Sequence, residues 1–191
     1  MTDYNPSQKT KPVLAVEHIL EPLSQSDLND LCDSTDAAIE SGGGFGWINL
    51  PARDILERYW QGVITAPTRW LFVARLDGVI CGTAQLILPA HHDEMHRHLA
   101  QLTTNFVSPW ARGHGLARLL IEEVEKKALS EGISVINLDV LEDMDAAIQL
   151  YESLGYIQCG THPYYGYSDN RVLIGRYYYK IIDENAVNQQ L

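Results

Sequence analysis

Apolar and polar positions follow two periods along the chain, one typical of strands and one typical of helices. Seven short segments are predicted to be strands because their apolar residues alternate with polar ones or run together: 13–20, 70–75, 79–88, 99–107, 135–140, 156–160 and 172–182. Helical spacing begins after Ser24, a residue type that caps helix N-termini, and its inward face is Leu28, Leu31, Cys32, Thr35 and Ile39. Three further helices are expected from Pro51 through Trp60, over 118–131 and over 145–154.

The elements follow one another in the order β-α-α-β-β-β-α-β-α-β-β. Asp77-Gly78 separates two of the strands and is a dipeptide typical of tight β-hairpin turns. At 191 residues the chain fits one domain. We expect that domain to cover 12–182, with a flexible leader at 1–11 and a polar tail at 183–191 that frays.

The junction between the fourth strand and the third helix has the composition of an anion-binding loop. Residues 107–117 read Val-Ser-Pro-Trp-Ala-Arg-Gly-His-Gly-Leu-Ala. Gly113 and Gly115 remove side chains where a ligand must approach closely, and they leave backbone N–H groups to face an anion. The helix that follows adds the positive end of its dipole. With Arg112 supplying a charge, the pattern Arg-x-x-Gly-x-Ala predicts a phosphate-binding loop.

A second pattern lies beyond the strand 135–140. Ala147, Tyr151 and Gly155 give the spacing Ala-x-x-x-Tyr-x-x-x-Gly, and the aromatic Tyr156 follows. The two motifs in this order resemble the GCN5-related N-acetyltransferase (GNAT) family over roughly 12–182, with the specificity concentrated in 105–156. The resemblance implies a mixed α/β fold, in which a splayed, mostly antiparallel sheet of about seven strands is flanked by about four helices.

The resemblance also implies acetyl-coenzyme A as the acetyl donor. Its pantetheine arm is expected between the splayed strands, against the backbone of Asn105, Phe106 and Val107, with the Asn105 N–H on the thioester oxygen. The remaining expected contacts come from the glycine loop, the helix start and the second motif: Arg112, Gly113, His114, Gly115, Leu116, Ala117, Arg118, Ala147 and Tyr151. Met144 stands where many family members carry Asn, which puts one cofactor hydrogen bond in doubt.

Acetyl transfer to an amine requires a neutral amine, a donor for the developing oxyanion and an acid for the departing thiolate. Tyr151 occupies the position from which family members often protonate the thiolate, and core packing is the alternative. Asp139 is the favoured general base, because an acid closing an apolar strand is costly unless it is hydrogen-bonded or used. Glu142, Asp143 and Glu40 are alternatives, and any of these acids could simply be a solvated carboxylate.

A looser resemblance concerns the acceptor. Three segments are similar to the tabtoxin-resistance branch of the family, which acetylates a small toxic amino-acid analogue: 41–47, Gly160-x-x-Pro163-x-x-Gly166-Tyr167 and Tyr178-Tyr179-Lys180. In that branch the residues at the Asp139 and Tyr151 positions are the proposed base and acid. We expect Phe45, Trp47 and Tyr165 to wall the pocket for a small-molecule amine acceptor, with Tyr164 and Tyr167 nearby; edge-strand packing is the alternative.

Composition narrows the choice of partners. The net charge of −11 and pI near 4.9 argue against duplex nucleic acid and anionic membranes, so the phosphates of coenzyme A need a local site. Three widely spaced cysteines and a polar start without an apolar signal core favour a cytoplasmic protein. We expect no metal site, since the histidines of 91–98 lie in a loop without helical ligand spacing. The oligomeric state stays open, a homodimer included.

These observations predict an acetyl-coenzyme A-dependent N-acetyltransferase that modifies the primary amine of a small molecule by direct attack in a ternary complex. A non-catalytic acyl-coenzyme A-binding module is the alternative, and Met144 is the one feature that favours it. A nicotinamide-dependent oxidoreductase is excluded, because the glycine loop lies deep in the chain and lacks the three-glycine fingerprint that opens a βαβ unit.

Overall fold

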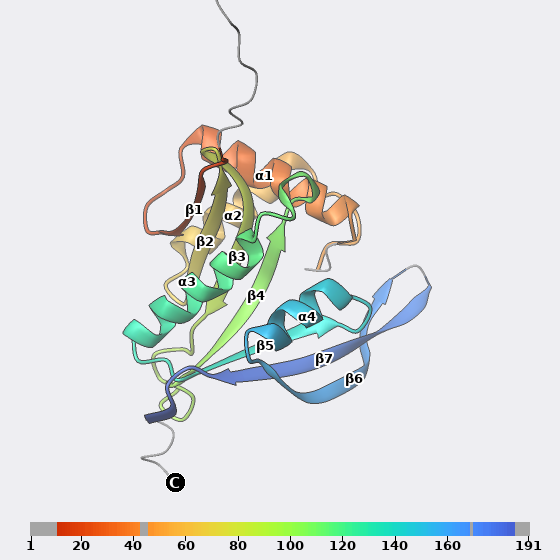
Figure 1. Cartoon of the computed structure of the whole chain (residues 1–191). Coiled ribbons are helices and arrows are strands. Elements are labelled where there is room, and N and C mark those ends of the chain that lie inside the picture. The colour runs from red at the N-terminus through yellow and green to blue at the C-terminus, as the bar shows by residue number, and fades with distance from the viewer. Residues whose placement is uncertain (1–10, 43–45, 169, 186–191) are drawn as a thin grey trace, which may run out of the picture.

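The computed structural model describes residues 11–42, 46–168 and 170–185, and a seven-stranded sheet runs through it in the order β1-β2-β3-β4-β5-β7-β6 (Figure 1). The strands are β1 (Leu14–Ile19), β2 (Arg69–Leu76), β3 (Val79–Ile87), β4 (Leu99–Val107), β5 (Val135–Leu141), β6 (Ile157–Ser168) and β7 (Arg171–Ile181). The helices are α1 (Gln25–Glu40), α2 (Arg53–Thr65), α3 (Leu116–Ser130) and α4 (Asp145–Ser153), with a 3₁₀ turn at Pro109–Ala111. The predicted order of elements and the mixed α/β class are confirmed.

The centre of the sheet splits between β4 and β5. These strands are parallel, whereas the other neighbouring pairs in the sheet are antiparallel. Their register runs from Leu99 opposite Val135 to Leu102 opposite Leu138. Beyond that point β4 stays paired with β3 and β5 with β7, so the two halves of the sheet diverge, as Figure 1 shows. The expected splay is therefore present.

A β-bulge bends β4 where the split opens. Gln85 of β3 pairs with Thr103 and Thr83 pairs with Phe106, so two residues of β4 lie opposite one residue of β3. Thr104, within the bulge, has a φ of 50°, in the left-handed region. An extra residue in one strand increases its bend and twist. The bulge thus turns the end of β4 away from β5.

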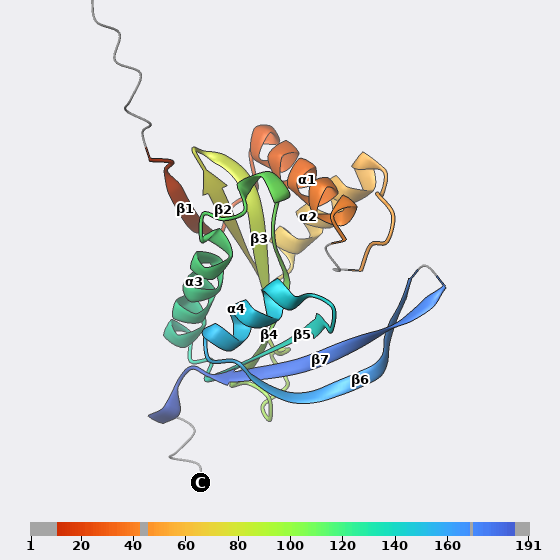
Figure 2. The same ribbon diagram turned by 45° about the vertical axis from the view of Figure 1, so that its right-hand side comes forward.

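Helices cover both faces of the sheet, with α1 and α2 on one face and α3 and α4 on the other (Figure 2). Each pair buries its own core. The core under α1 and α2 includes Leu31, Trp60 and Phe106. The core under α3 and α4 includes Leu120 and Tyr151. The sheet therefore separates two apolar layers, and the split between β4 and β5 lies between them.

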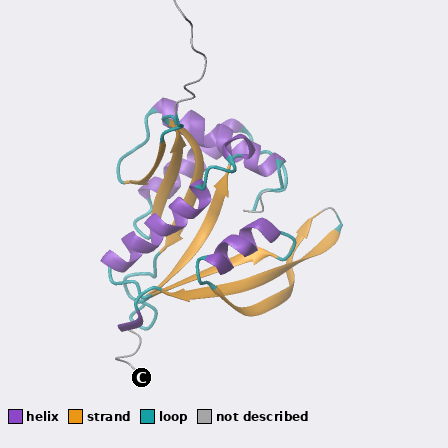
Figure 3. Ribbon diagram, viewed as in Figure 1, coloured by secondary structure: helices purple, strands orange, loops and turns teal. Residues whose placement is uncertain are grey.

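The ends of several elements differ from the sequence prediction. The strand predicted over 156–160 begins at Ile157 and runs to Ser168, forming a long hairpin with β7 that projects from the body (Figure 3). Its proline and glycines made the second half look like a loop, but pairing with β7 keeps it extended. Helix α3 starts at Leu116, two residues earlier than expected, and α2 starts at Arg53, two residues after Pro51.

Cys32 and Cys81 lie buried as free thiols, and burial raises the pKa of each to about 11, while Cys159 is exposed and also free. None of the helices in the described residues is long and apolar enough to cross a membrane.

Candidate functional site

A cavity of about 170 Å³ occupies the split between β4 and β5. Residues from five separate segments line it: Gly46, Leu102, Thr103, Thr104, Asn105, Asp139, Val140, Leu141, Met144, Ala147, Tyr151 and Tyr165. Five predicted site residues therefore line the same cavity, and four of them are Asn105, Asp139, Tyr151 and Tyr165. Ala147 joins them from α4.

The two predicted catalytic residues approach the cavity from opposite faces of the sheet. Tyr151 belongs to the core formed with α3 and α4, and so does Val140 of β5. Successive residues of a strand point to opposite faces, so the neighbouring Asp139 faces the other side. A group bound in the split would thus have a hydroxyl on one side and a carboxylate on the other.

Asn105 connects the bulge of β4 to the Tyr151 hydroxyl. Its Nδ2 donates a hydrogen bond of 3.3 Å to the Tyr151 hydroxyl oxygen. The Tyr151 side chain is 6% exposed, and burial raises its pKa above the ordinary value of 10, an effect that the Asn105 hydrogen bond partly offsets. The phenol therefore keeps its proton throughout the neutral range.

Asp139 is held by two donors. Gln101 Nε2 donates to Oδ1 at 2.8 Å, and the Tyr165 hydroxyl donates to Oδ2. Burial and the neighbouring Asp139 carboxylate raise the pKa of Tyr165, so this hydroxyl also stays protonated. Two donors on separate oxygens fix the plane of the carboxylate while leaving each oxygen a further lone pair.

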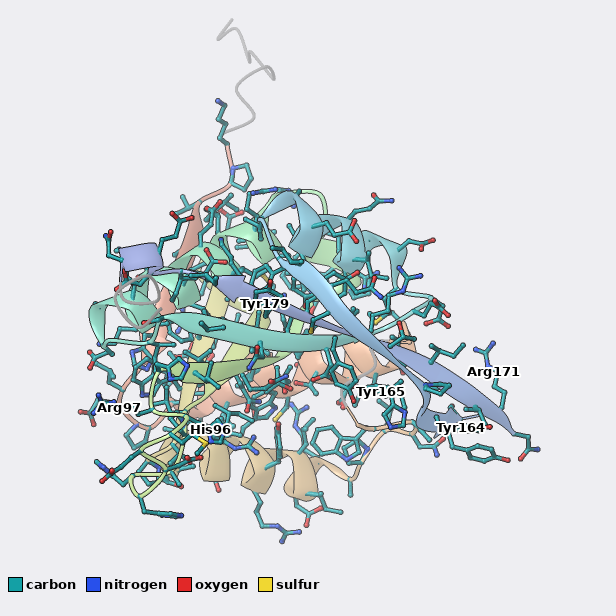
Figure 4. The ribbon with its side chains drawn as sticks, turned by 90° about the horizontal axis from the view of Figure 1, so that it is seen from below. His96, Arg97, Tyr164, Tyr165, Arg171 and Tyr179 are labelled. Atoms are coloured by element: carbon teal, nitrogen blue, oxygen red, sulfur yellow. The ribbon has the colours of Figure 1, made fainter. Side chains whose placement is uncertain are left out.

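Tyr165 reaches Asp139 from the β6–β7 hairpin. In Figure 4 it points inward toward the body, whereas Tyr164 and Arg171 lie out along the hairpin. A Cβ atom at Gly175 of β7 would collide with the Tyr165 ring, so the glycine makes room for the aromatic side chain. Tyr164 and Tyr167 are 76% and 63% exposed and do not line the cavity.

The predicted phosphate loop turns through two glycines with positive φ. Gly113 and Gly115 have φ values of 82° and 80°, which L side chains rarely adopt, and a Cβ at either position would meet open space. Gly115 is the N-cap of α3 and provides no side-chain cap, so the first-turn N–H groups of Leu116, Ala117 and Arg118 face outward without a capping side chain. His114 Nδ1 lies 3.2 Å from the Ala111 carbonyl.

Both arginines of this loop already have partners. Arg112 donates to the Val107 carbonyl at 3.2 Å and to the Ser41 hydroxyl at 3.0 Å, so it ties the end of β4 to the end of α1. Arg118 donates to Ser153 Oγ at 2.7 Å and thereby connects α3 to α4. Their charges lie beside the glycine loop, while their N–H donors connect it to neighbouring elements.

The other sequence candidates lie outside the cavity or at its edge. Phe45 falls outside the described residues. Trp47 is half-buried and packs edge-on against Tyr59, with 4.8 Å between the ring centroids. Trp47 does not line the cavity, whereas the neighbouring Gly46 does. Of the alternative bases, Glu142 pairs with Arg176 at 2.9 Å, and the exposed Asp143 and Glu40 do not line the cavity. Met144 lines it with an apolar side chain and caps α4 without a side-chain hydrogen bond.

The histidines of 91–98 lie in an exposed loop between β3 and β4. His96 lies 2.9 Å from Asp93 on the exposed loop, and no group of three or more His, Cys, Asp or Glu side chains suited to a metal occurs among these residues. Figure 4 places His96 and Arg97 on the opposite side of the molecule from Tyr164.

A family comparison agrees with this geometry. The model of the acetyltransferase (GNAT) family matches residues 38–156, which is more than half of the chain. The chain belongs to the GNAT family. It is 57% identical, over 129 residues, to an uncharacterized N-acetyltransferase encoded in the hisH–hisA intergenic region of Azospirillum brasilense, a match that covers 68% of this chain and 76% of that protein.

Solved structures share the fold at low sequence identity. An N-acetyltransferase from Staphylococcus aureus Mu50 has a TM-score of 0.76 at 18% identity and covers 90% of this chain and 99% of its own. YncA of Salmonella typhimurium, a putative acetyltransferase solved with its cofactor acetyl-CoA, has a TM-score of 0.72 at 19% identity. The match covers 91% of this chain and 96% of YncA. These neighbours confirm the predicted GNAT fold, with its mixed seven-stranded sheet and four helices.

Several site residues escaped the sequence prediction. Gln101 and Gly175 support Asp139 and Tyr165 from strands whose patterns indicated only alternation. The side chain of Asn105 was given no role, since only its backbone was expected to matter. A polar residue at an inward position of β4 was the available signal for both Gln101 and Asn105.

Proposed function

We propose that this chain is an acetyl-coenzyme A-dependent N-acetyltransferase that acts on the primary amine of a small molecule. The observation that carries the proposal is that Asp139 and Tyr151 line one shared cavity and approach the split from opposite faces of the sheet. A base and an acid on either side of one gap suit direct attack in a ternary complex.

The residues present fit acetyl-coenzyme A, which would supply an acyl carbon activated as a thioester. The glycine loop and the uncapped start of α3 offer backbone N–H groups to its pyrophosphate. The segment 103–107 pairs with β3 but not with β5, which leaves one edge of β4 for the pantetheine arm. Asn105 N–H would stabilise negative charge that develops on the carbonyl oxygen.

The side chains divide the proton transfers. Asp139 would take a proton from the attacking amine nitrogen as the new N–C bond forms. Tyr151 would give its phenolic proton to the sulfur as the C–S bond breaks, since burial keeps that proton in place. Gln101 and Tyr165 would hold the Asp139 carboxylate in the orientation that receives the proton.

The charge of the cavity favours a cationic amine as acceptor. Among the described residues that line it, Asp139 alone carries a charge. An ammonium group is attracted to that carboxylate, whereas an acidic group near it is repelled. We therefore place simple amines ahead of acceptors with a carboxylate beside the amine. The small amino-acid analogues acetylated by the tabtoxin-resistance branch belong to the second class, so they provide a useful contrast.

The proposal is tested by coenzyme A release across a panel of primary amines that includes polyamines, aminoglycosides and amino-acid analogues. We expect release to depend on one class of amine, and mass spectrometry to find that amine acetylated. N-acetylated members of the panel serve as matched controls, since they lack the attacking nitrogen. Tight coenzyme A binding without amine-dependent release for any member would instead favour a non-catalytic binding module.

A further inference from the structure

Only one of the two polar atoms in the Asn105 carboxamide has a hydrogen-bond partner among the described residues. Nδ2 donates to the Tyr151 hydroxyl, whereas Oδ1 is buried and has no hydrogen-bond partner among the described residues. A buried acceptor without a donor lowers stability, so such atoms in folded proteins usually mark a missing ligand or water. Asn105 lines the cavity in the split, which is where a ligand would supply the donor.

The engaged half of the carboxamide determines where the Tyr151 proton points. The hydroxyl oxygen accepts from Asn105, so its own hydrogen must be directed elsewhere. No acceptor for that hydrogen is present among the described residues. The proton is therefore available to the group that binds in the cavity, and burial keeps it on the oxygen.

Apart from Tyr151, the α4 side of the cavity offers a ligand no polar side chain among the described lining residues. Met144 and Ala147 line the same part of the cavity from α4, and both are apolar. Among the described lining residues, Asn105 is the sole carboxamide. In coenzyme A two methylene groups separate the sulfur from the nearest amide N–H. A carboxamide that contacts the proton donor for the sulfur is therefore suited to receive this N–H.

We propose that Asn105 is a positioning residue whose Nδ2 turns the Tyr151 proton toward the coenzyme sulfur while its Oδ1 accepts the nearest amide N–H of the pantetheine arm. One side chain would thus fix the distance between the acid and its leaving group. The binding half concerns coenzyme A alone. The kinetic half rests on the proposed function.

The binding half is tested by calorimetry with coenzyme A and Asn105→Leu, which keeps the side-chain shape and removes both polar atoms. We expect the affinity to fall about tenfold, the value of one hydrogen bond. Asn137→Leu on β5 is the matched control, since Asn137 is half-buried but does not line the cavity, and it should leave the affinity unchanged. Unchanged affinity in a folded Asn105→Leu variant, or a loss confined to thermal stability, would overturn the proposal.

The variant Asn105→Asp separates the proposed binding role of Oδ1 from the proposed positioning role of Nδ2. The carboxylate still accepts an N–H but cannot donate to Tyr151, and it attracts the phenolic proton to itself. We expect coenzyme A affinity within about threefold of the wild type and kcat lowered as far as in Tyr151→Phe. A kcat equal to that of the wild type would contradict the positioning role.

A double-mutant cycle decides whether Asn105 acts through Tyr151. In a Tyr151→Phe background, Asn105→Leu should lower kcat no further, because the proton that it positions is already gone. The same loss in both backgrounds would show a merely structural role. If the wild type acetylates no amine, the proposed function fails, and coenzyme A affinity alone then decides the inference.

Discussion

The two sides of the split between β4 and β5 are built in different ways. The side of α3 and α4 uses the glycine loop and Tyr151, which are both contained in residues 105–156. The opposite side gathers Gly46, Gln101, Asp139 and Tyr165 from segments spread over most of the chain. In the proposed function, the first side would bind the cofactor through backbone groups and local motifs, whereas the second would recognise the acceptor through side chains that only the tertiary fold brings together.

The largest expected effect is a loss of coenzyme A affinity when the glycine loop is changed. Gly115→Glu should reduce coenzyme A affinity by roughly two orders of magnitude or more, because a carboxylate would stand where the N–H groups of α3 must meet phosphate. Calorimetry measures this. Gly132→Glu is the matched control, since Gly132 has a φ of 82° and equally open surroundings at the far end of α3. Retained binding in a folded Gly115→Glu variant would place the phosphates elsewhere.

A second prediction concerns the proposed general base, Asp139, on the opposite side of the split. Asp139→Asn keeps the shape of the side chain but removes the base, so kcat should fall by roughly 100-fold or more on an accepted amine. Steady-state kinetics with saturating amine and acetyl-coenzyme A measures this. Glu142→Gln is the control, because Glu142 pairs with Arg176 outside the cavity. If Glu142→Gln had the larger effect, the base would have been misassigned.

A third prediction concerns the acid. Tyr151→Phe keeps the packing of the ring and removes its proton, so kcat should fall by roughly tenfold to several hundredfold with little change in coenzyme A affinity. Burial raises the pKa of Tyr151, so the acid should stay active to a higher pH than a solvated tyrosine would. Tyr178→Phe, an equally buried tyrosine outside the cavity, should leave kcat unchanged. An unchanged kcat in Tyr151→Phe would assign Tyr151 to packing.

The smallest expected effect concerns Trp47 and tests whether the proposed acceptor site extends to this residue. Trp47 packs on Tyr59 and adjoins Gly46, which lines the cavity. Trp47→Ala should raise KM for the amine by about three- to tenfold and leave KM for acetyl-coenzyme A nearly unchanged. Trp70→Ala, which removes another half-buried indole, should lower stability alone. Equal changes in both KM values for Trp47→Ala would show that the residue serves the core.

The sequence predicted the fold well because local patterns determine it. The order of the elements, the hairpin at Asp77-Gly78 and the conformation of the glycine loop all follow from short segments. The strand predicted over 156–160 was too short because Pro163 and Gly166 suggest a loop, and only pairing with β7 overrides that preference up to Ser168.

The site was predicted less completely, because several of its contacts depend on long-range strand pairing rather than on local patterns. Asp139 and Tyr151 could be proposed from motif positions. The contacts of Asp139 with Gln101 and Tyr165 depend on strand register, which no spacing in the sequence reveals. The idle oxygen of Asn105 depends on the bulge of β4, which has no clear sequence signal here.

Hydrogen–deuterium exchange with and without saturating coenzyme A tests most directly whether the split is the cofactor site. We predict slower exchange in two segments, 103–107 of β4 and 113–118 at the start of α3, because the ligand would occupy their exposed N–H groups. The β6–β7 hairpin, on the acceptor side, should exchange at the same rate in both states. Protection confined to other segments, or no protection at saturation, would contradict the assignment of the split as the coenzyme A site.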